Sequence, residues 1–124
     1  FYYTADTPVA KAFTKSYQAK HGNPPGYAPA AAYGMTRMVL HAMDRAKSTD
    51  HVEVLKALEG LEVEDLVGKM RVDAKTHQTL RPYFFMRCKK KDQMKHAMDF
   101  ADIIATGSTP LPAEYGACKD IGAV

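Results

Sequence analysis

The amino-acid sequence predicts a mixed α/β chain, in which a short strand is followed by three helices and then by further strands. Apolar residues recur at helical spacing through the first half of the chain, and from Leu61 onward they alternate or form short runs. Capping residues, prolines and glycines stand where the pattern changes. Because helices with one apolar face need a sheet to cover that face, we expect a single α/β unit.

The first helix is predicted from its caps. Residues 1–4 precede it as a short strand, because aromatic residues and threonine suit a pleated surface. The helix begins at Thr7-Pro8, a hydroxyl N-cap followed by proline at the first helical position, and ends at Gly22. Residues 23–26 then form a rigid turn. The apolar stripe of this helix consists of Val9, Phe13 and Tyr17.

Two more helices follow. The second is predicted from about residue 28 to residue 46, and its alanine-rich start allows close approach to another backbone or to a ligand. The third begins after Asp50, which has Glu53 three positions later as in a capping box, and ends at Gly60. The expected buried residues are Ala32, Met35, Val39, Leu40 and Met43 in the second helix and Val52, Leu55 and Leu58 in the third.

The second half of the chain is predicted to contain strands. In residues 68–73, Met70 and Val72 share one face. Residues 82–88 form a nearly continuous apolar run that is too short for a typical helix, so we expect a strand buried on both faces. The remaining segments are a solvated turn at 89–92, a strand at 98–106 and a C-terminal loop with a short turn near 112–115.

Composition excludes several classes of protein. The length of 124 residues allows at most one domain. The chain is 46% apolar, 25% charged and 10% aromatic, unlike disordered, collagen-like or disulfide-dense proteins. No apolar run approaches the roughly 18 residues of a membrane-spanning helix. The net charge of +3 is too small to indicate a nucleic-acid-binding protein.

Motifs for common chemistries are absent from the sequence. The glycines form no phosphate-binding loop, no G-x-S-x-G occurs, and the two cysteines do not form a C-x-x-C pair. His96 and Asp99 would lie together as metal ligands only on a helix, and their surroundings favour a strand. We therefore expect no catalytic residue, no metal site and no cofactor.

Two charged clusters have a functional and a structural interpretation. Lys89-Lys90-Lys91 with Lys95 would suit a phosphate or an acidic partner, but no aromatic residues alternate with them, which favours a solvated hairpin turn. Glu62, Glu64 and Asp65 would suit acid–base catalysis, but they follow Gly60 with no base or nucleophile beside them, which favours a solvated loop.

A longer pattern runs from Phe13 through Tyr17 and Gly22 to Pro25 in the form F-x-x-x-Y-x-x-x-x-G-x-x-P, before an aromatic residue and an alanine-rich helix with Tyr33. This order and spacing resembles the C-terminal third of the type I periplasmic binding proteins of ABC transporters, of the branched-chain amino acid (leucine, isoleucine and valine) type. The resemblance is strongest over residues 13–72 and fades after residue 91. It also covers Thr7-Pro8, Ser48-Thr49-Asp50, Ala57-Leu58-Glu59-Gly60, Arg71-Val72-Asp73 and Thr76-His77-Gln78.

The resemblance implies a two-lobed α/β protein with hinge strands, in which residues 1–124 are a single C-terminal segment that contributes to both lobes. Such a protein is the extracytoplasmic solute-binding component of an ABC importer, which closes around a solute and delivers it to a permease in the membrane. The implied solute is an amino acid or a related small organic acid or amide. No bond is made or broken, so the protein is not an enzyme. The implied location is the periplasm or another extracytoplasmic space, with the signal peptide outside this chain.

The resemblance also points to ligand-binding residues. It assigns contact with the ligand's side chain to the aromatic residue before the alanine-rich helix, which is Tyr27 with Ala28 beside it; alternatively, Tyr27 packs on the turn prolines. Tyr2 and Tyr3, at the end of the first predicted strand, face the cleft or, by preference, pack in the core or at a sheet edge. Gly34 departs from the pattern, because relatives often have an acidic residue after the helix tyrosine.

Members close to this chain carry a late strand and a C-terminal cysteine, which implies a disulfide between Cys88 and Cys118. The bond would close a loop of about thirty residues and contribute roughly 3–4 kcal/mol to stability. The alternative is two reduced thiols, of which Cys88 at the end of a buried strand is the buried one.

A C-terminal segment by itself leaves apolar sheet edges and helix faces uncovered, so we expect self-association as a dimer that pairs strands or swaps elements. Two other functions stay open at this point. One is a ligand-sensing domain of a receptor or regulator with the same fold, which a neighbouring signalling module would favour. The other is a small α+β enzyme, which three polar residues converging in one closed pocket would favour.

Overall fold

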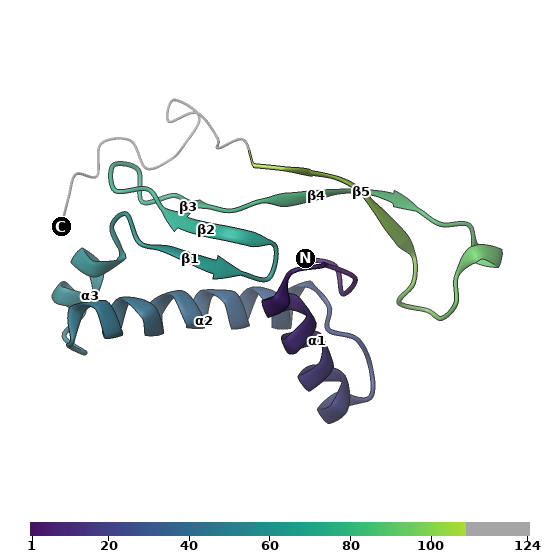
Figure 1. The fold of residues 1–124 in the computed structure, drawn as a ribbon, viewed down its shortest axis with the longest axis horizontal. Helices are drawn as coiled ribbons and strands as arrows, with labels where there is room; N and C mark the ends of the chain where they lie inside the picture. The colour runs from purple at the N-terminus through teal and green to yellow at the C-terminus, as the bar shows by residue number, and fades with distance from the viewer. Residues whose placement is uncertain (109–124) are drawn as a thin grey trace.

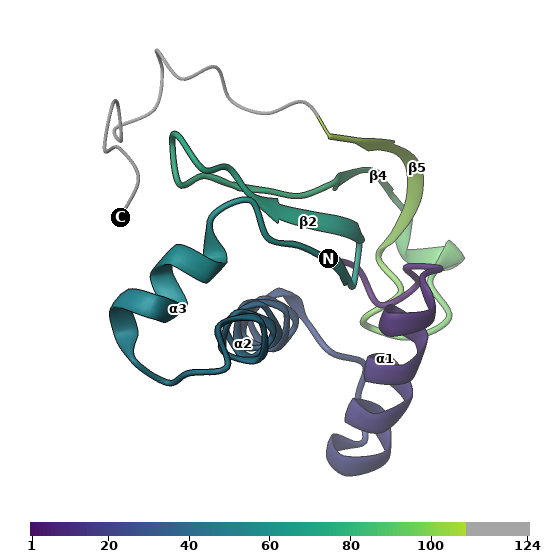
Figure 2. The ribbon, with the colours of Figure 1, turned by 60° about the vertical axis from the view of Figure 1, so that its left-hand side comes forward.

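The computed structural model of the chain describes residues 1–108, so Cys118 and the turn expected near residues 112–115 lie outside the described residues. Three helices are followed by a three-stranded sheet and a two-stranded ribbon (Figure 1). A view nearly along α2 shows this helix below the sheet, with α3 on one side and α1 on the other (Figure 2). The predicted mixed α/β fold with three helices before most of the strands is confirmed.

The first helix, α1 (Pro8–His21), has the predicted ends. The Thr7 hydroxyl accepts a 3.0 Å hydrogen bond from the backbone N–H of Ala10. Gly22 ends the helix at a φ of 75°, a left-handed conformation that glycine adopts without strain, and its N–H donates to the Gln18 carbonyl. Local capping chemistry therefore determines both ends of α1.

The other two helices, α2 (Tyr27–Ala46) and α3 (His51–Leu58), also lie where they were predicted. The carboxylate of Asp50 caps α3 by accepting hydrogen bonds from the backbone N–H groups of Val52 and Glu53. The side chain of Glu53 instead pairs with Lys56 at 3.4 Å.

The buried face of α2 differs from the predicted one. Its buried residues recur every four positions, at Ala30, Gly34, Met38 and Ala42. Three of these four residues are alanine or glycine, which lets the helix approach its neighbours closely, and Met38 is the one large side chain in the buried stripe. Of the predicted residues, Ala32, Met35 and Leu40 are exposed and Val39 and Met43 are half-buried; in α3, Val54 and Ala57 are buried, Val52 and Leu58 are half-buried and Leu55 is exposed.

The sheet is antiparallel and has the order β1-β2-β3. Its strands are β1 (Glu62–Asp65), β2 (Gly68–Val72) and β3 (Thr79–Leu80). Met70 and Val72 share the buried face of β2, as predicted. They pack with Val63 against Met38 of α2. A second apolar cluster joins α2 to α3, and a third, made of Ala5, Ala10, Ala30 and Leu66, joins the N-terminal segment to α1 and α2.

The solvated loop predicted around Glu62, Glu64 and Asp65 is wrong, because these residues form β1 and pair with β2. Side chains alternate across a strand, so Glu62 and Glu64 are exposed while Asp65 is buried. Glu62 forms a 2.7 Å ion pair with Lys69 on the neighbouring strand. In this hairpin the carboxylates of Glu62 and Glu64 therefore lie at the surface, and that of Asp65 lies in the interior.

The strand predicted for residues 1–4 is also wrong. Residues 3 and 4 lie in a turn, and the N–H of Ala5 donates a 3.0 Å hydrogen bond to the carbonyl of Tyr2. No strand pairs with these residues in the described part of the chain. Their position is instead determined by the side chain of Tyr2.

The ribbon consists of β4 (Tyr83–Cys88) and β5 (Ala101–Gly107), and it extends past the helices (Figure 1). A strand at residues 82–88 is confirmed, but its burial on both faces is wrong, because Phe84 alone in β4 is half-buried and the rest is exposed. The reason is that β4 pairs with β5 and no described helix covers it (Figure 2). A short 3-10 helix, η1 (Lys91–Gln93), lies in the connection where a turn was expected.

Cys88 is exposed at the end of β4 and carries a free thiol. The expected disulfide is therefore not found in residues 1–108, and its second member, Cys118, lies beyond them. The predicted burial of Cys88 is wrong, because Cys88 ends β4 and no described helix covers this strand. None of the described helices has the length and apolarity that crossing a membrane requires.

Candidate functional site

Four segments of the chain meet at the amino end of α2 and surround a cavity of about 300 Å³. The predicted ligand-contact residues Tyr2, Tyr3 and Tyr27 all line this cavity. Ala28, which was predicted beside them, is exposed and does not line it. The remaining walls are Phe1, Pro25, Gly26, Met86, Met98 and Phe100.

A second cavity, of about 320 Å³, adjoins the first and shares Phe1, Tyr27 and Met86 with it. Its other walls are Arg81, Pro82, Tyr83 and Phe84. We call the two cavities together the aromatic trough. Tyr27 lines both halves and is 70% exposed, so most of its ring is free for contact with a solute.

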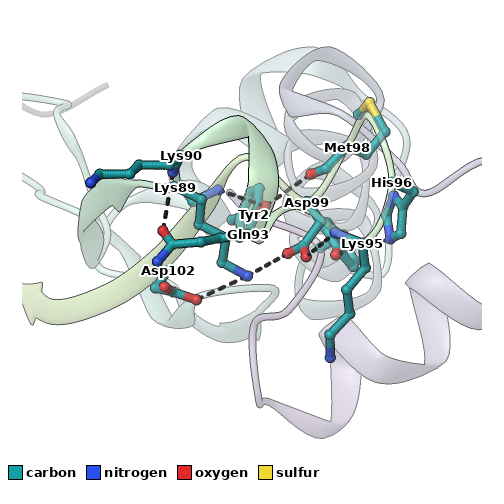
Figure 3. A network of polar contacts seen from close by, with 11 residues as sticks. Tyr2, Lys89, Lys90, Gln93, Lys95, His96, Met98, Asp99 and Asp102 are labelled. Carbon is teal, nitrogen blue, oxygen red and sulfur yellow. Dashed lines mark hydrogen bonds and ion pairs between the residues drawn. The ribbon is translucent and has the colours of Figure 1, made fainter.

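Tyr2 is held in the wall of the trough by its hydroxyl group (Figure 3). The hydroxyl donates to the Met98 carbonyl over 2.8 Å and accepts from the Ala101 N–H over 3.2 Å. The ring packs edge-on against Phe100, with 5.1 Å between the ring centres, and the residue is only 4% exposed. Tyr2 therefore presents its ring to the trough while its hydroxyl is already hydrogen-bonded within the protein.

An ion network fastens the connection between β4 and β5 to the same wall (Figure 3). The ammonium group of Lys89 lies 2.6 Å from Asp99 Oδ1 and 3.1 Å from Asp102 Oδ1, and the second oxygen of Asp99 accepts from the Lys95 N–H. The bond to Lys89, followed by that to Lys95, lowers the pKa of Asp99. The bonds to Asp99 and Asp102 raise the pKa of Lys89. Lys89 is thus part of an internal network, which differs from the predicted solvated turn, whereas Lys90, Lys91 and Lys95 are exposed as predicted.

Tyr3 lies beside His96 at the edge of the trough. Its hydroxyl is 3.3 Å from His96 Nε2, and the two ring centres are 5.7 Å apart. Burial and then the Asp99 carboxylate raise the pKa of Tyr3. No group of three or more His, Cys, Asp or Glu side chains in residues 1–108 is placed to hold a metal ion.

Arg81 supplies a positive charge at the other half of the trough. Its side chain is half-buried, and within residues 1–108 its guanidinium forms no ion pair or hydrogen bond. Arg81 and Phe1 line the same half of the trough. The site therefore combines apolar walls with one cation that has no partner in the described chain.

Close to the trough, a buried carboxylate lies against α2. Asp65 is 1% exposed, and neither of its oxygens has a hydrogen-bond partner in the described residues. It occupies the space beside Gly34, where a Cβ added to the glycine would lie 2.6 Å from Asp65 Oδ1. Asp65 of β1 thus fills the space that the missing side chain of Gly34 leaves open on α2.

Sequence reasoning missed Arg81, Met86, Met98, Phe100 and the interior position of Asp65. The first four line the trough from segments that are distant in sequence from Tyr27, and no spacing rule connects them. For Asp65 one signal was present, since a glycine inside an otherwise alanine-rich helix marks a point of close approach.

Known proteins provide a direct comparison. Residues 1–93 match the family model described as periplasmic binding protein. The amino acid ABC transporter substrate-binding protein of Pseudomonas fluorescens Pf-5 is 27% identical with a TM-score of 0.85, over 95% of this chain and 32% of that chain. A branched-chain amino acid ABC transporter periplasmic ligand-binding protein of Burkholderia xenovorans LB400 is also 27% identical, with a TM-score of 0.74, over 87% and 29%.

A third structure, the leucine-, isoleucine-, valine-, threonine- and alanine-binding protein of Brucella ovis in its closed conformation, has the same fold at 20% identity, with a TM-score of 0.72 over 87% and 29% of the two chains. No curated protein sequence matches the chain. The chain spans about a third of the length of the structures that it matches. The family match and the shared architecture agree: the chain belongs to the periplasmic binding protein family and has part of the type I fold.

Proposed function

We propose that the chain is part of the solute-binding component of an ABC importer and that the aromatic trough is its contribution to the binding cleft. The solute is an amino acid or a related small organic molecule, and the protein delivers it to a permease from the extracytoplasmic side of the membrane. Two similar structures, both 27% identical, are described as amino-acid-binding components of ABC transporters, which supports this choice of solute.

One observation carries the proposal: Tyr2 and Tyr3 of the N-terminal segment and Tyr27 at the start of α2 line one cavity of about 300 Å³. Cavities of this size with apolar walls and few polar groups are typical of small-molecule sites. Tyr27 is 70% exposed, and its ring packs against no other aromatic ring in residues 1–108. A large exposed aromatic side chain beside a cavity supports contact with a ligand more than a packing role.

Binding in this family of folds implies that a second lobe closes over the solute. In the proposed closed state the trough is one wall of the cleft, and the exposed ring of Tyr27 is covered on closure. The amino-acid side chain lies against the trough, and the groups on the other lobe complete its coordination.

The test uses the full-length gene product and isothermal titration calorimetry with the twenty standard amino acids. We expect at least one of them to bind, and Tyr27→Ala to weaken its affinity about tenfold or more, because a central aromatic contact is lost. Tyr33→Ala is the matched control, since Tyr33 lies on the same helix, is also exposed and stacks on Phe13 away from the trough. Absence of binding by the wild type, or equal affinity in the Tyr27→Ala variant, would contradict the proposal.

A further inference from the structure

Two basic segments that are distant in sequence lie side by side in the structure (Figure 2). The first is α1, which contains three lysines and no acidic residue. The second is the connection between β4 and β5, where residues 89–98 contain four lysines and one acidic residue. Both segments contribute to the walls of one groove of about 410 Å³, formed by Gln18, Gly22, Asn23, Pro24, His96, Ala97 and Met98.

The lysines beside this groove have no acidic partner. Lys15 stands three positions before Gln18, on the same face of α1. Lys15, Lys91 and Lys95 are exposed, and none of them forms an ion pair within residues 1–108. Elsewhere the chain pairs several of its lysines with a nearby carboxylate, namely Lys11, Lys47, Lys56 and Lys69. We call the following set the basic face: Lys15, Lys91, Lys95 and His96.

The carboxylates closest to the basic face are already engaged. Asp99 is buried and bonds to the Lys89 ammonium and the Lys95 N–H, and Asp102 also pairs with Lys89. The side chain of Lys95 points away from this network (Figure 3). Asp92 is the one exposed acidic residue among residues 89–98. The basic face therefore keeps a positive charge, and a negatively charged surface laid against it would relieve the repulsion between its lysines.

The composition of the basic face distinguishes between two kinds of negatively charged partner. Protein interfaces are enriched in arginine and aromatic residues, which act as anchors, and are depleted in lysine. The basic face contains no arginine and no exposed aromatic side chain. Lysine is a compact, hydrated charge on a flexible stem, which suits a surface of many equivalent anions. Clusters of lysine are accordingly attracted to anionic lipid headgroups, without any fixed pairing geometry.

We propose that the basic face binds the anionic headgroups of a membrane surface. Met98 lines both the groove and the aromatic trough, and the Tyr3 hydroxyl at the edge of the trough lies 3.3 Å from His96 Nε2. Contact through the basic face therefore brings this edge of the trough towards the membrane, where the permease of the proposed function resides. The proposal goes beyond that function, because the attraction depends on the lysines and does not require a bound solute.

The test is sedimentation of the full-length gene product with vesicles. Vesicles of phosphatidylcholine alone are compared with vesicles of phosphatidylcholine and phosphatidylglycerol in equal parts. We expect binding to the anionic vesicles only, and its loss at high salt, which screens exposed charges. The double variant Lys91→Gln/Lys95→Gln should lower the partition coefficient about tenfold or more, because two charges near the anionic surface are removed.

The matched control is Lys56→Gln/Lys69→Gln. It removes the same number of charges from lysines that are paired with Glu53 and Glu62, away from the groove, and should leave the partition coefficient nearly unchanged. Lys15→Gln is a single change on α1 and should lower the partition coefficient by a smaller factor than the double variant. It also tests the basic face if the double variant does not fold.

Three results would overturn the proposal: no binding of the wild type to anionic vesicles, equal binding to both kinds of vesicle, or an equal loss in the control variant. The last of these would show that net charge acts without the basic face. Calorimetry with amino acids on the same preparations keeps the two proposals apart. Vesicle binding by a protein that binds no amino acid would support the basic face and contradict the proposed function.

Discussion

The carboxylate of Asp65 occupies the space where a side chain on Gly34 would stand: a Cβ added to Gly34 would lie 2.6 Å from Asp65 Oδ1. The first residue is on β1 and the second is in the middle of α2. Because Gly34 has no side chain, the helix and the strand approach each other closely at this point. The contact packs α2, whose first residue Tyr27 lines the trough, against β1 of the three-stranded sheet.

This contact predicts that Gly34→Ala destabilises the chain in the presence of Asp65. A methyl group at that distance must displace a buried carboxylate or move the helix, which costs about 1–3 kcal/mol as for other overpacked sites. The free energy of unfolding, measured by urea denaturation, reports the loss.

The same substitution should raise the free energy of unfolding when Asp65 is replaced by a smaller residue. In an Asp65→Ala background the space beside Gly34 is open, and alanine stabilises a helix interior by about 0.5–1 kcal/mol relative to glycine. A double-mutant cycle therefore gives a coupling energy between the two positions. If Gly34→Ala has the same effect in both backgrounds, the contact does not control the packing of α2 on β1.

The hydroxyl of Tyr2 predicts a second stability effect. Tyr2→Phe leaves the Met98 carbonyl and the buried N–H of Ala101 without their partner, so we expect a loss of about 1–2 kcal/mol. Tyr3→Phe is the control, because the Tyr3 hydroxyl is at an exposed contact with His96 and bonds to no backbone group, so its removal should change stability by less than about 0.5 kcal/mol. Equal losses in the two variants, measured by urea denaturation, would contradict this difference.

The Asp99 network predicts a pH effect on stability. Its pKa is lowered in the folded chain, first by Lys89, so folding is favoured when Asp99 is ionised. This contribution is present above the unfolded value of about 3.9 and is lost as the pH falls through the lower folded value. The stability difference between wild type and Asp99→Asn should therefore shrink as the pH is lowered below about 4.

Asp6→Asn is the control for the pH prediction. Asp6 also has a lowered pKa from its pairing with Lys11, but both side chains are largely exposed and water screens their interaction. We expect thermal melts at a series of pH values to show a small and nearly constant difference for Asp6→Asn. A pH-independent difference for Asp99→Asn would show that the ion network does not stabilise the fold.

The β4–β5 ribbon predicts self-association of residues 1–124. Phe85 is 51% exposed and Ile104 is 53% exposed, and an isolated two-stranded ribbon is only marginally stable in water. We expect dimers in size-exclusion chromatography with light scattering at high concentration, formed by strand pairing or exchange. Replacing both residues with threonine should shift the chain towards monomer, and Arg87→Gln on the same ribbon should not. A clean wild-type monomer at high concentration would contradict the prediction.

The helix ends could be predicted from sequence because each depends on groups a few residues apart. Thr7 and Asp50 cap the helices that follow them, and Gly22 adopts the left-handed conformation that ends α1. The burial of β4 could not be predicted in this way, because an apolar run shows that a strand forms and does not show what covers it. The buried face of α2 follows small residues such as Gly34 for a similar reason: the choice depends on how close β1 lies.

The residues of the candidate site also differ in whether local sequence could predict them. Tyr27 was predicted from a motif that lies within one stretch of sequence, and Arg81 was missed because nothing in its neighbourhood connects it to Tyr27. The sequence by itself determined the family, the three helices and the aromatic residue at the start of α2, since these depend on local order and spacing. The tertiary structure alone decided that Tyr2, Tyr27 and Arg81 line one trough and that Asp65 lies inside, because chain path and close packing bring distant residues together.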